Sequence, residues 1–166
     1  MPYVEYNQMP AHSRVWVYQS TRNLTQQEID FANSQIRQFV DGWTSHQRDL
    51  SAWGGVMMQR FVVLAVDEQR ADASGCSIDK STHFMQALGT QLRTDFFNRM
   101  NFAYLDPSDG QIKSADSQDF AALYAQHKIT ASTLVFNNLV QTKAELESKW
   151  RTPLAESWHR NFVGGV

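Results

Sequence analysis

The sequence FVVLAV at positions 61–66 is the longest strongly apolar run of the chain. It has the length of a β-strand and is far too short to cross a bilayer. A second candidate strand, at 51–58, precedes it closely enough to form a hairpin with it, although no Asn-Gly or Asp-Gly pair marks the turn. This part of the chain therefore predicts two neighbouring strands of an antiparallel sheet.

Upstream of this hairpin, the sequence predicts one strand followed by one helix. The strand is RVWVYQ at 14–19, which is rich in β-branched and aromatic residues. Thr25 and Glu28 have the spacing of a capping box, in which each side chain accepts a hydrogen bond from a free backbone N–H at a helix start. Apolar residues follow at helical spacing as far as Trp43, so we expect an amphipathic helix that packs on the sheet.

Downstream, a polar loop at 67–75 leads into a second long helix, predicted from about 77 to 97. A fourth strand is expected at 101–105, followed by a turn with the sequence DPSDG and a short strand at 112–114. The resulting order is β-α-β-β-α-β. It is typical of the ferredoxin-like split βαβ arrangement, an α+β fold in which one antiparallel sheet carries both helices on one face.

The last third of the chain predicts further helices. One is expected near 117–126, before an extended stretch at 133–136. Thr142 with Glu145 forms a second capping box, and Thr152 followed by Pro153 is typical of another helix start. We therefore expect one domain, with a core at about 14–115 and a C-terminal helical extension at about 116–162 packed on it.

Alternation along the first strand predicts two different sheet faces. Trp16 and Tyr18 share one face, while Val15 and Val17 share the other. We expect the two helices to cover the Val face and four further residues to join the Trp16 face: Trp53, Met57, Phe102 and Tyr104. The candidate cover for this aromatic face is the apolar set of the C-terminal helices: Leu146, Trp150, Leu154, Trp158 and Phe162. The alternatives are an exposed face that stacks single-stranded nucleic acid and a face that closes a homodimer.

Composition narrows the class of protein. The chain has 166 residues, of which 42% are hydrophobic and 19% are charged, as expected for a globular domain. The net charge of −2 gives no basic field for nucleic acid or anionic membrane. With Cys76 as the single cysteine, no internal disulfide can form, and no secretory signal is recognisable at the N-terminus. We therefore expect a cytoplasmic protein without a cofactor.

One candidate catalytic group lies at the start of the second helix. Cys76, Asp79 and His83 share one helical face, so Cys76 could act as nucleophile, His83 as base and Asp79 as the orienting carboxylate of a thiol-dependent enzyme. However, this face lies about 150° from the apolar stripe of the same helix, which predicts a solvated surface. Three candidate ligands are also too few to indicate a metal site.

The same region resembles a phosphate-binding loop only superficially. The motif G-x-x-x-x-G-K-[ST] requires a glycine before its lysine, and Asp79 precedes Lys80 here. A carboxylate at that position would repel a phosphate. The sequence therefore argues against ATP hydrolysis.

Our leading functional hypothesis is a non-catalytic binding or regulatory module. Its groove is expected between residues 75–83 and 137–143, with a small molecule or a protein as the ligand. Paired asparagines after a strand are common turn residues, and their amides can also contact a ligand. The candidate ligand-binding residues are Ser74, Gly75, Ser77, Asn137, Asn138 and Lys143.

Several stretches are similar to a known family across about residues 9–162. They are RVWVYQ at 14–19, VDE at 66–68 through SGCSID at 74–79, LVFNNLV at 134–140 through Trp150, and ESW at 156–158. They resemble a family of small uncharacterised proteins from Bacteroidetes-type bacteria, some of which are labelled transporter ATPases. The resemblance implies a bacterial cytosolic protein and supplies no activity, substrate or catalytic residue.

Overall fold

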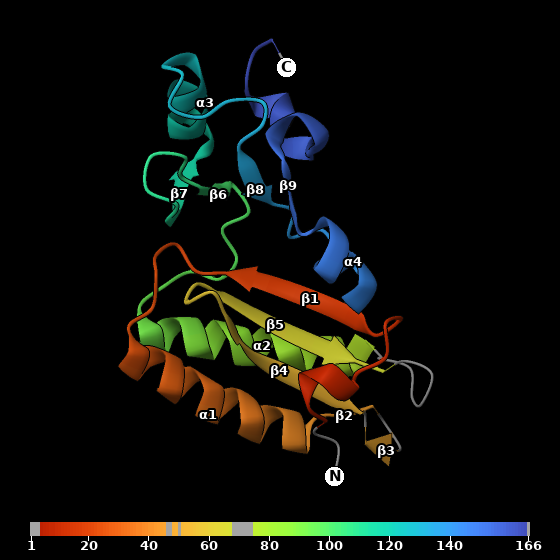
Figure 1. The fold of residues 1–166 in the computed structure, drawn as a ribbon. Helices are drawn as coiled ribbons and strands as arrows, with labels where there is room; N and C mark the ends of the chain where they lie inside the picture. Colours follow the sequence, from red (N-terminus) through yellow and green to blue (C-terminus); the bar gives the residue numbers. More distant parts are fainter. Residues whose placement is uncertain (1–3, 46–47, 50, 68–74, 166) are drawn as a thin grey trace.

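The computed structural model describes residues 4–45, 48–49, 51–67 and 75–165, and it has an α+β fold (Figure 1). The strands are β1 (Arg14–Gln19), β2 (Thr44–Ser45), β3 (Arg48–Asp49), β4 (Ala52–Met57), β5 (Phe61–Val66), β6 (Asn101–Leu105), β7 (Ile112–Asp116), β8 (Leu134–Phe136) and β9 (Arg151–Pro153). The α-helices are α1 (Gln26–Gly42), α2 (Gly75–Leu92), α3 (Ser117–Ala125) and α4 (Lys143–Lys149). Short 3₁₀ helices cover Tyr6–Gln8, Leu154–Glu156 and Trp158–Phe162.

The first sheet has the order β1-β5-β4, with both pairings antiparallel. This is the order that the ferredoxin-like arrangement gives to its first three strands, and α1 and α2 cover one face as predicted (Figure 1). The strand predicted at 101–105 is present as β6, but its predicted place in the first sheet is wrong, because β6 belongs to a second antiparallel sheet with the order β7-β6-β8-β9. β6 pairs with its hairpin partner β7 and with β8 instead of β1, so β1 remains an edge strand of the first sheet.

The helices cover the face opposite to the one predicted. Trp16 and Tyr18 pack in the core formed by α1, α2 and the first sheet, whereas Val15 and Val17 belong to the core on the other side. Both faces of β1 are apolar, so alternation alone could not indicate which face the helices take. In the structure, Trp16 packs near the end of α1: its ring centroid lies 6.1 Å from that of Trp43, the residue that follows this helix.

The placement of Trp53 and Met57 on the Trp16 face is also wrong. Trp53 lies opposite Ala65, which lies opposite Val15, and residues paired across antiparallel strands share a face. Trp53 and Met57 therefore join the Val15 core. Phe102 and Tyr104 lie in the second sheet.

The C-terminal part of the chain covers the sheet face that α1 and α2 leave free, as expected, but this is the Val15 face instead of the predicted Trp16 face, and the cover is a sheet with one helix. Leu146 and Trp150 pack in this core together with Phe136 of β8. The other three residues predicted to cover the first sheet, Leu154, Trp158 and Phe162, form a separate core on the far side of the second sheet. Both faces of the described first sheet are thus covered by the chain itself, and no aromatic face is open for base stacking.

The helix predicted to open at Thr152 is wrong, although Thr142 does cap α4. Residues 151–153 pair with 134–136 of β8 to form β9. Pro153 is compatible with this strand because β9 lies at the edge of its sheet, where one strand side has no hydrogen-bond partner. Long-range pairing therefore overrides the local helix-start signal.

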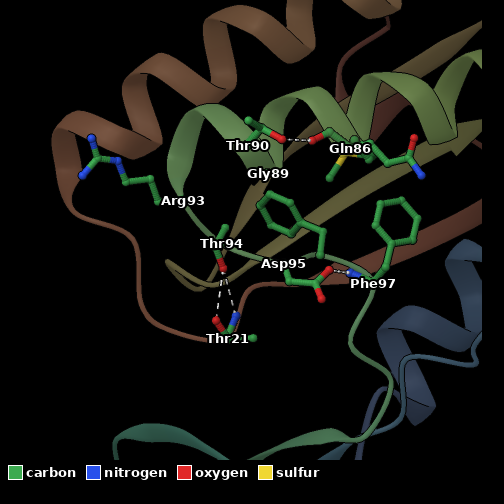
Figure 2. A pocket seen from close by; sticks show the side chains of 10 residues that line it. Thr21, Gln86, Gly89, Thr90, Arg93, Thr94, Asp95 and Phe97 are labelled. Atoms are coloured by element: carbon green, nitrogen blue, oxygen red, sulfur yellow. Dashed lines mark hydrogen bonds between the residues drawn. The ribbon is translucent and has the colours of Figure 1, made fainter.

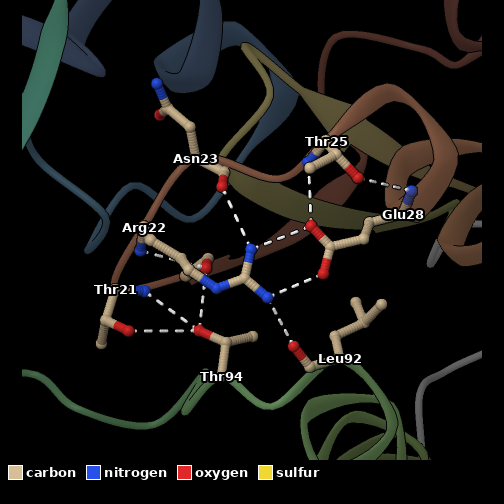
Figure 3. A network of polar contacts seen from close by, with 8 residues as sticks. Thr21, Arg22, Asn23, Thr25, Glu28, Leu92 and Thr94 are labelled. Carbon is tan, nitrogen blue, oxygen red and sulfur yellow. Dashed lines mark hydrogen bonds and ion pairs between the residues drawn. The ribbon is translucent and has the colours of Figure 1, made fainter.

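A polar cluster fixes the loop after β1 to both helices (Figure 3). The guanidinium of Arg22 donates to the two carboxylate oxygens of Glu28, at 2.9 and 2.7 Å, and to the C=O of Leu92 at 2.6 Å. Arg22 lowers the pKa of Glu28 to about 2. Glu28 also accepts from the backbone N–H of Thr25, so the predicted capping box is part of this cluster.

Candidate functional site

A cavity of about 730 Å³ runs along β1, on its edge that faces away from β5. We call it the β1 cavity. It lies where a ferredoxin-like fold would place its fourth strand. Its walls are formed by residues 14–19, Ile78, Thr82, residues 96–102, residues 138–141, Trp158 and His159.

The cavity brings together residues of the two segments, 75–83 and 137–143, between which the sequence predicted a groove. Ile78 and Thr82 belong to the predicted segment 75–83, and residues 138–141 belong to the predicted segment 137–143. The structure places β1 and residues 96–102 between them, and neither stretch was predicted as part of the groove. A signal for Leu139 existed in the sequence, because a large apolar residue directly after two asparagines of a turn has no obvious core partner.

The outer edge of β1 is paired only near its N-terminal end, where the backbone N–H of Val15 donates to the C=O of Gln141 at 2.9 Å. Alternate residues of a strand direct their N–H and C=O groups to the same side. Those of residues 15, 17 and 19 therefore point away from β5. At the other end, the side chain of Gln19 donates to the C=O of Asn101 at 2.8 Å. Between these points, no residue that the structure describes hydrogen bonds the outward N–H or C=O of Val17.

The charge of the cavity walls is positive. Arg14 and Arg99 are the cations, and among the described lining residues there is no Asp or Glu. The guanidinium carbon of Arg14 lies 5.2 Å from the centroid of the Trp16 ring. Its Nε is buried without a hydrogen-bond partner among the described residues, which leaves one donor of a cation unsatisfied beside the cavity.

Exposed apolar side chains form the rim. In the described part of the chain, six large hydrophobic residues are exposed, and four of them line this cavity. The four are Ile78, Phe97, Met100 and Leu139, with exposed fractions of 39%, 38%, 44% and 59%. A cluster of exposed apolar residues on a folded surface is typical of a binding site.

Asn137 and Asn138 both have structural hydrogen bonds. Asn137 Oδ1 accepts from the backbone N–H of Leu139 and from Trp158 Nε1, both at 3.1 Å, as expected for a turn residue. Asn138 Oδ1 accepts from Trp150 Nε1 at 2.9 Å, and its Nδ2 donates to Gln19 Oε1 at 2.9 Å. Asn138 also lines the β1 cavity, so its amide connects the C-terminal part of the chain to the end of β1.

Lys143 lies away from this cavity. Its side chain is buried, and its Nζ donates to the C=O of Met9 at 2.8 Å and lies 4.6 Å from the centroid of the Tyr6 ring. Glu147 approaches the same Nζ at 3.8 Å. In this structure Lys143 therefore anchors the N-terminal segment.

The predicted thiol group does not line the cavity either, as far as the structure describes it. Asp79 and His83 are exposed on α2, in agreement with the solvated face predicted for them. Gly75, Cys76 and Ser77 lie in the first turn of α2, and their side chains, like all of Ser74, are outside the described residues. The thiol-enzyme hypothesis stays a prediction.

A second cavity, of about 600 Å³, lies at the C-terminal end of α2 (Figure 2). Several of its polar groups bond to one another: Thr94 Oγ1 is 3.2 Å from both the backbone nitrogen and the hydroxyl of Thr21, and Asp95 accepts from the backbone N–H of Phe97 at 2.8 Å. α2 ends at Leu92, five residues before the predicted boundary near 97, and Arg93 follows it with a φ of 55°. We attribute this cavity to the helix end.

His159 lies in the wall of the β1 cavity and is almost fully buried. Its Nδ1 is 2.6 Å from the hydroxyl of Ser157, and burial lowers its pKa from 6.5 to about 4. Between these two pH values the unfolded chain binds more protons at His159 than the folded chain does. We therefore expect the free energy of unfolding to fall by about 3 kcal/mol from this residue as the pH falls through that window.

Chemical denaturation of the wild type and of His159→Gln, at pH 7 and at pH 4, measures this effect. The wild type should lose more stability than the variant between the two pH values. His83→Gln, at an exposed position of α2, is the control and should keep the wild-type pH dependence. Equal pH dependence of the wild type and His159→Gln would contradict the assignment.

Two further observations concern the described residues alone. These residues contain no group of three or more His, Cys, Asp or Glu side chains arranged to hold a metal ion. Among the helices described, none combines the length and apolar character needed to span a membrane.

The chain matches no protein-family model, no curated protein and no solved structure in the comparisons with known proteins.

Proposed function

We propose that this protein is a non-catalytic binding or regulatory module whose ligand occupies the β1 cavity. The observation that carries the proposal is that four of the six large hydrophobic residues exposed in the described part of the chain gather around one cavity. Apolar walls with a few polar groups of defined position are typical of ligand sites. Here the polar groups include the two arginines, the free edge of β1 and the amide of Asn138.

The cellular setting is part of the same proposal. A single cysteine, Cys76, leaves the chain without an internal disulfide, which suits a reducing compartment, and we propose the cytoplasm. The resemblance to the Bacteroidetes-type family supports a bacterial origin.

The dye anilinonaphthalene sulfonate (ANS) tests whether the cavity accepts a ligand. ANS combines an apolar ring system with one sulfonate, so the apolar rim and the arginines should both favour its binding. We expect saturable fluorescence enhancement with the folded protein. Leu139→Ser and Met100→Ser should each weaken binding about fivefold, because each removes apolar surface that the dye would cover.

Phe31→Ser is the matched control. Phe31 is 40% exposed, close to the 44% of Met100, but it lies on α1 and does not line the cavity. Its replacement should leave ANS binding unchanged. An equal effect of Phe31→Ser and Leu139→Ser, or no ANS binding to the folded protein, would contradict the proposed function.

A further inference from the structure

We infer that the ligand of the β1 cavity is an extended peptide segment with acidic side chains, which adds to β1 as a further strand. This inference rests on the proposed function and specifies the class of ligand. Three properties of the cavity support it, and they concern backbone hydrogen bonding, charge and the alternation of side chains.

The first property is the free edge of β1. An unpaired strand edge binds an extended chain through backbone hydrogen bonds, a recurrent mode of peptide recognition. The outward N–H and C=O of Val17 are without partners among the described residues, and every residue of β1 lines the cavity. A peptide residue opposite Val17 can exchange both hydrogen bonds with it, which leaves the pairing of β1 with β5 unchanged.

The second property is the length of this free edge. Gln141 occupies the position opposite Val15, and Asn101 binds the side chain of Gln19. The open part therefore covers Trp16, Val17 and Tyr18. It fits a short peptide segment better than a second copy of β1, because the chain's own segments block both ends of the strand.

The third property is charge on one side of the strand. Side chains of alternate residues share a face, so Arg14 lies on the same face as Trp16 and Tyr18. Burial raises the pKa of Tyr18, and the positive charge of Arg99, which lines the same cavity, opposes this shift. Both cations therefore belong to one side of the added strand.

Arginine is well suited to carboxylates, because its planar guanidinium can donate two parallel hydrogen bonds. Arg14 has a buried Nε without a described partner, and no described residue forms an ion pair with Arg14 or Arg99. A carboxylate that accepts from Arg14 would satisfy this donor. We therefore expect acidic residues at the two peptide positions opposite Trp16 and Tyr18.

The residue between them should be apolar. Its side chain would lie on the face of Val17, where Val140 and Leu139 belong to the cavity wall. The expected recognition pattern is thus acidic-apolar-acidic over three residues in extended conformation.

The probe is the synthetic peptide acetyl-Glu-Val-Glu-Val-Glu-amide, titrated by calorimetry and followed by NMR at the Val17 amide. We expect binding to the wild type with a shift of that amide signal. Two matched peptides should bind at least about tenfold more weakly: one with Lys in place of every Glu, and one with N-methylvaline in place of every Val. The first reverses the charge, and the second removes the N–H that would donate to Val17.

Protein variants test the same contacts from the other side. Arg14→Gln should weaken binding at least about tenfold, whereas Arg37→Gln, at a surface position of α1, should not.

Val17→Pro removes the N–H that would donate to the peptide, and it should therefore weaken binding. This N–H points away from β5, and such a position tolerates proline in an edge strand. Val17→Thr keeps that N–H and should bind like the wild type. If Val17→Pro fails to fold, the N-methylated peptide on the wild type still decides the question.

The outcomes separate this inference from the proposed function. ANS binding at the cavity without binding of the acidic peptide overturns the peptide inference and leaves the binding module. Equal affinity for the acidic and basic peptides, or for the N-methylated peptide, also overturns it. A dimer in solution that Val17→Pro dissociates would assign the edge to a second copy and overturn it as well. If the folded protein binds neither ANS nor the acidic peptide, the proposed function fails and the peptide inference fails with it.

Discussion

Replacing Phe102 with alanine is expected to lower the free energy of unfolding by about 3–5 kcal/mol. Phe102 is the central ring of the core on the far side of the second sheet, and its side chain is 1% exposed. Its ring centroid lies within 4.9–5.4 Å of four other rings, those of Phe120, Trp158, His159 and Phe162. These neighbours come from different segments, so the structure cannot close easily around the space that the alanine would leave.

Urea denaturation of the variant and the wild type measures this loss, and Phe31→Ala provides the control. Phe31 is 40% exposed, so its truncation should cost less than about 1 kcal/mol. Phe102 also lines the β1 cavity, and we expect Phe102→Ala to weaken ANS binding as well. A loss below about 1 kcal/mol for Phe102→Ala would show that the second sheet does not fold around this ring.

Features with a local cause were predictable from the sequence. The capping boxes at Thr25 and Thr142 require only residues three positions apart, and both helices begin where these boxes predict. The hairpin of β4 and β5 also joins neighbouring segments. The α+β class and the common face of α1 and α2 follow from such signals.

Features that depend on partners distant in the sequence were not predictable in the same way. Nothing in residues 101–105 indicates whether they pair with β1 or with β8, which lies some thirty residues further along the chain. Thr152 and Pro153 fit a helix start and an edge strand equally well, and pairing with β8 decides between them.

The candidate site shows the same limit. The two segments on either side of the groove could be associated from their residues, but the floor of the groove could not. The edge of β1 is free because the strand predicted to pair with it, β6, belongs to the second sheet. Arg14 and Arg99 are 85 positions apart in the sequence, and only the fold brings both to the wall of one cavity.

Trp150→Ala is expected to lower the free energy of unfolding by about 3–5 kcal/mol, because Trp150 fills the core between the first sheet and the C-terminal part of the chain. Its ring centroid lies 4.8 Å from that of Phe61 on β5 and 5.4 Å from that of Phe136 on β8. Urea denaturation measures the loss. Trp150→Phe is the informative comparison, since it keeps most of the apolar contact and removes the indole N–H.

The two substitutions separate packing from hydrogen bonding. Trp150→Phe should cost roughly 1–3 kcal/mol, because it leaves Asn138 Oδ1 without the donor that holds it at 2.9 Å. Asn138 could then turn away from Gln19. The NMR signal of the Gln19 side-chain amide should therefore move in Trp150→Phe, as we also expect for Asn138→Ala.

Equal losses of stability for Trp150→Ala and Trp150→Phe would mean that the indole hydrogen bond outweighs packing. If the Gln19 signal stays unchanged in Trp150→Phe, Trp150 stabilises the core without positioning the end of β1, and the cavity depends on the backbone pairing at Gln141 instead.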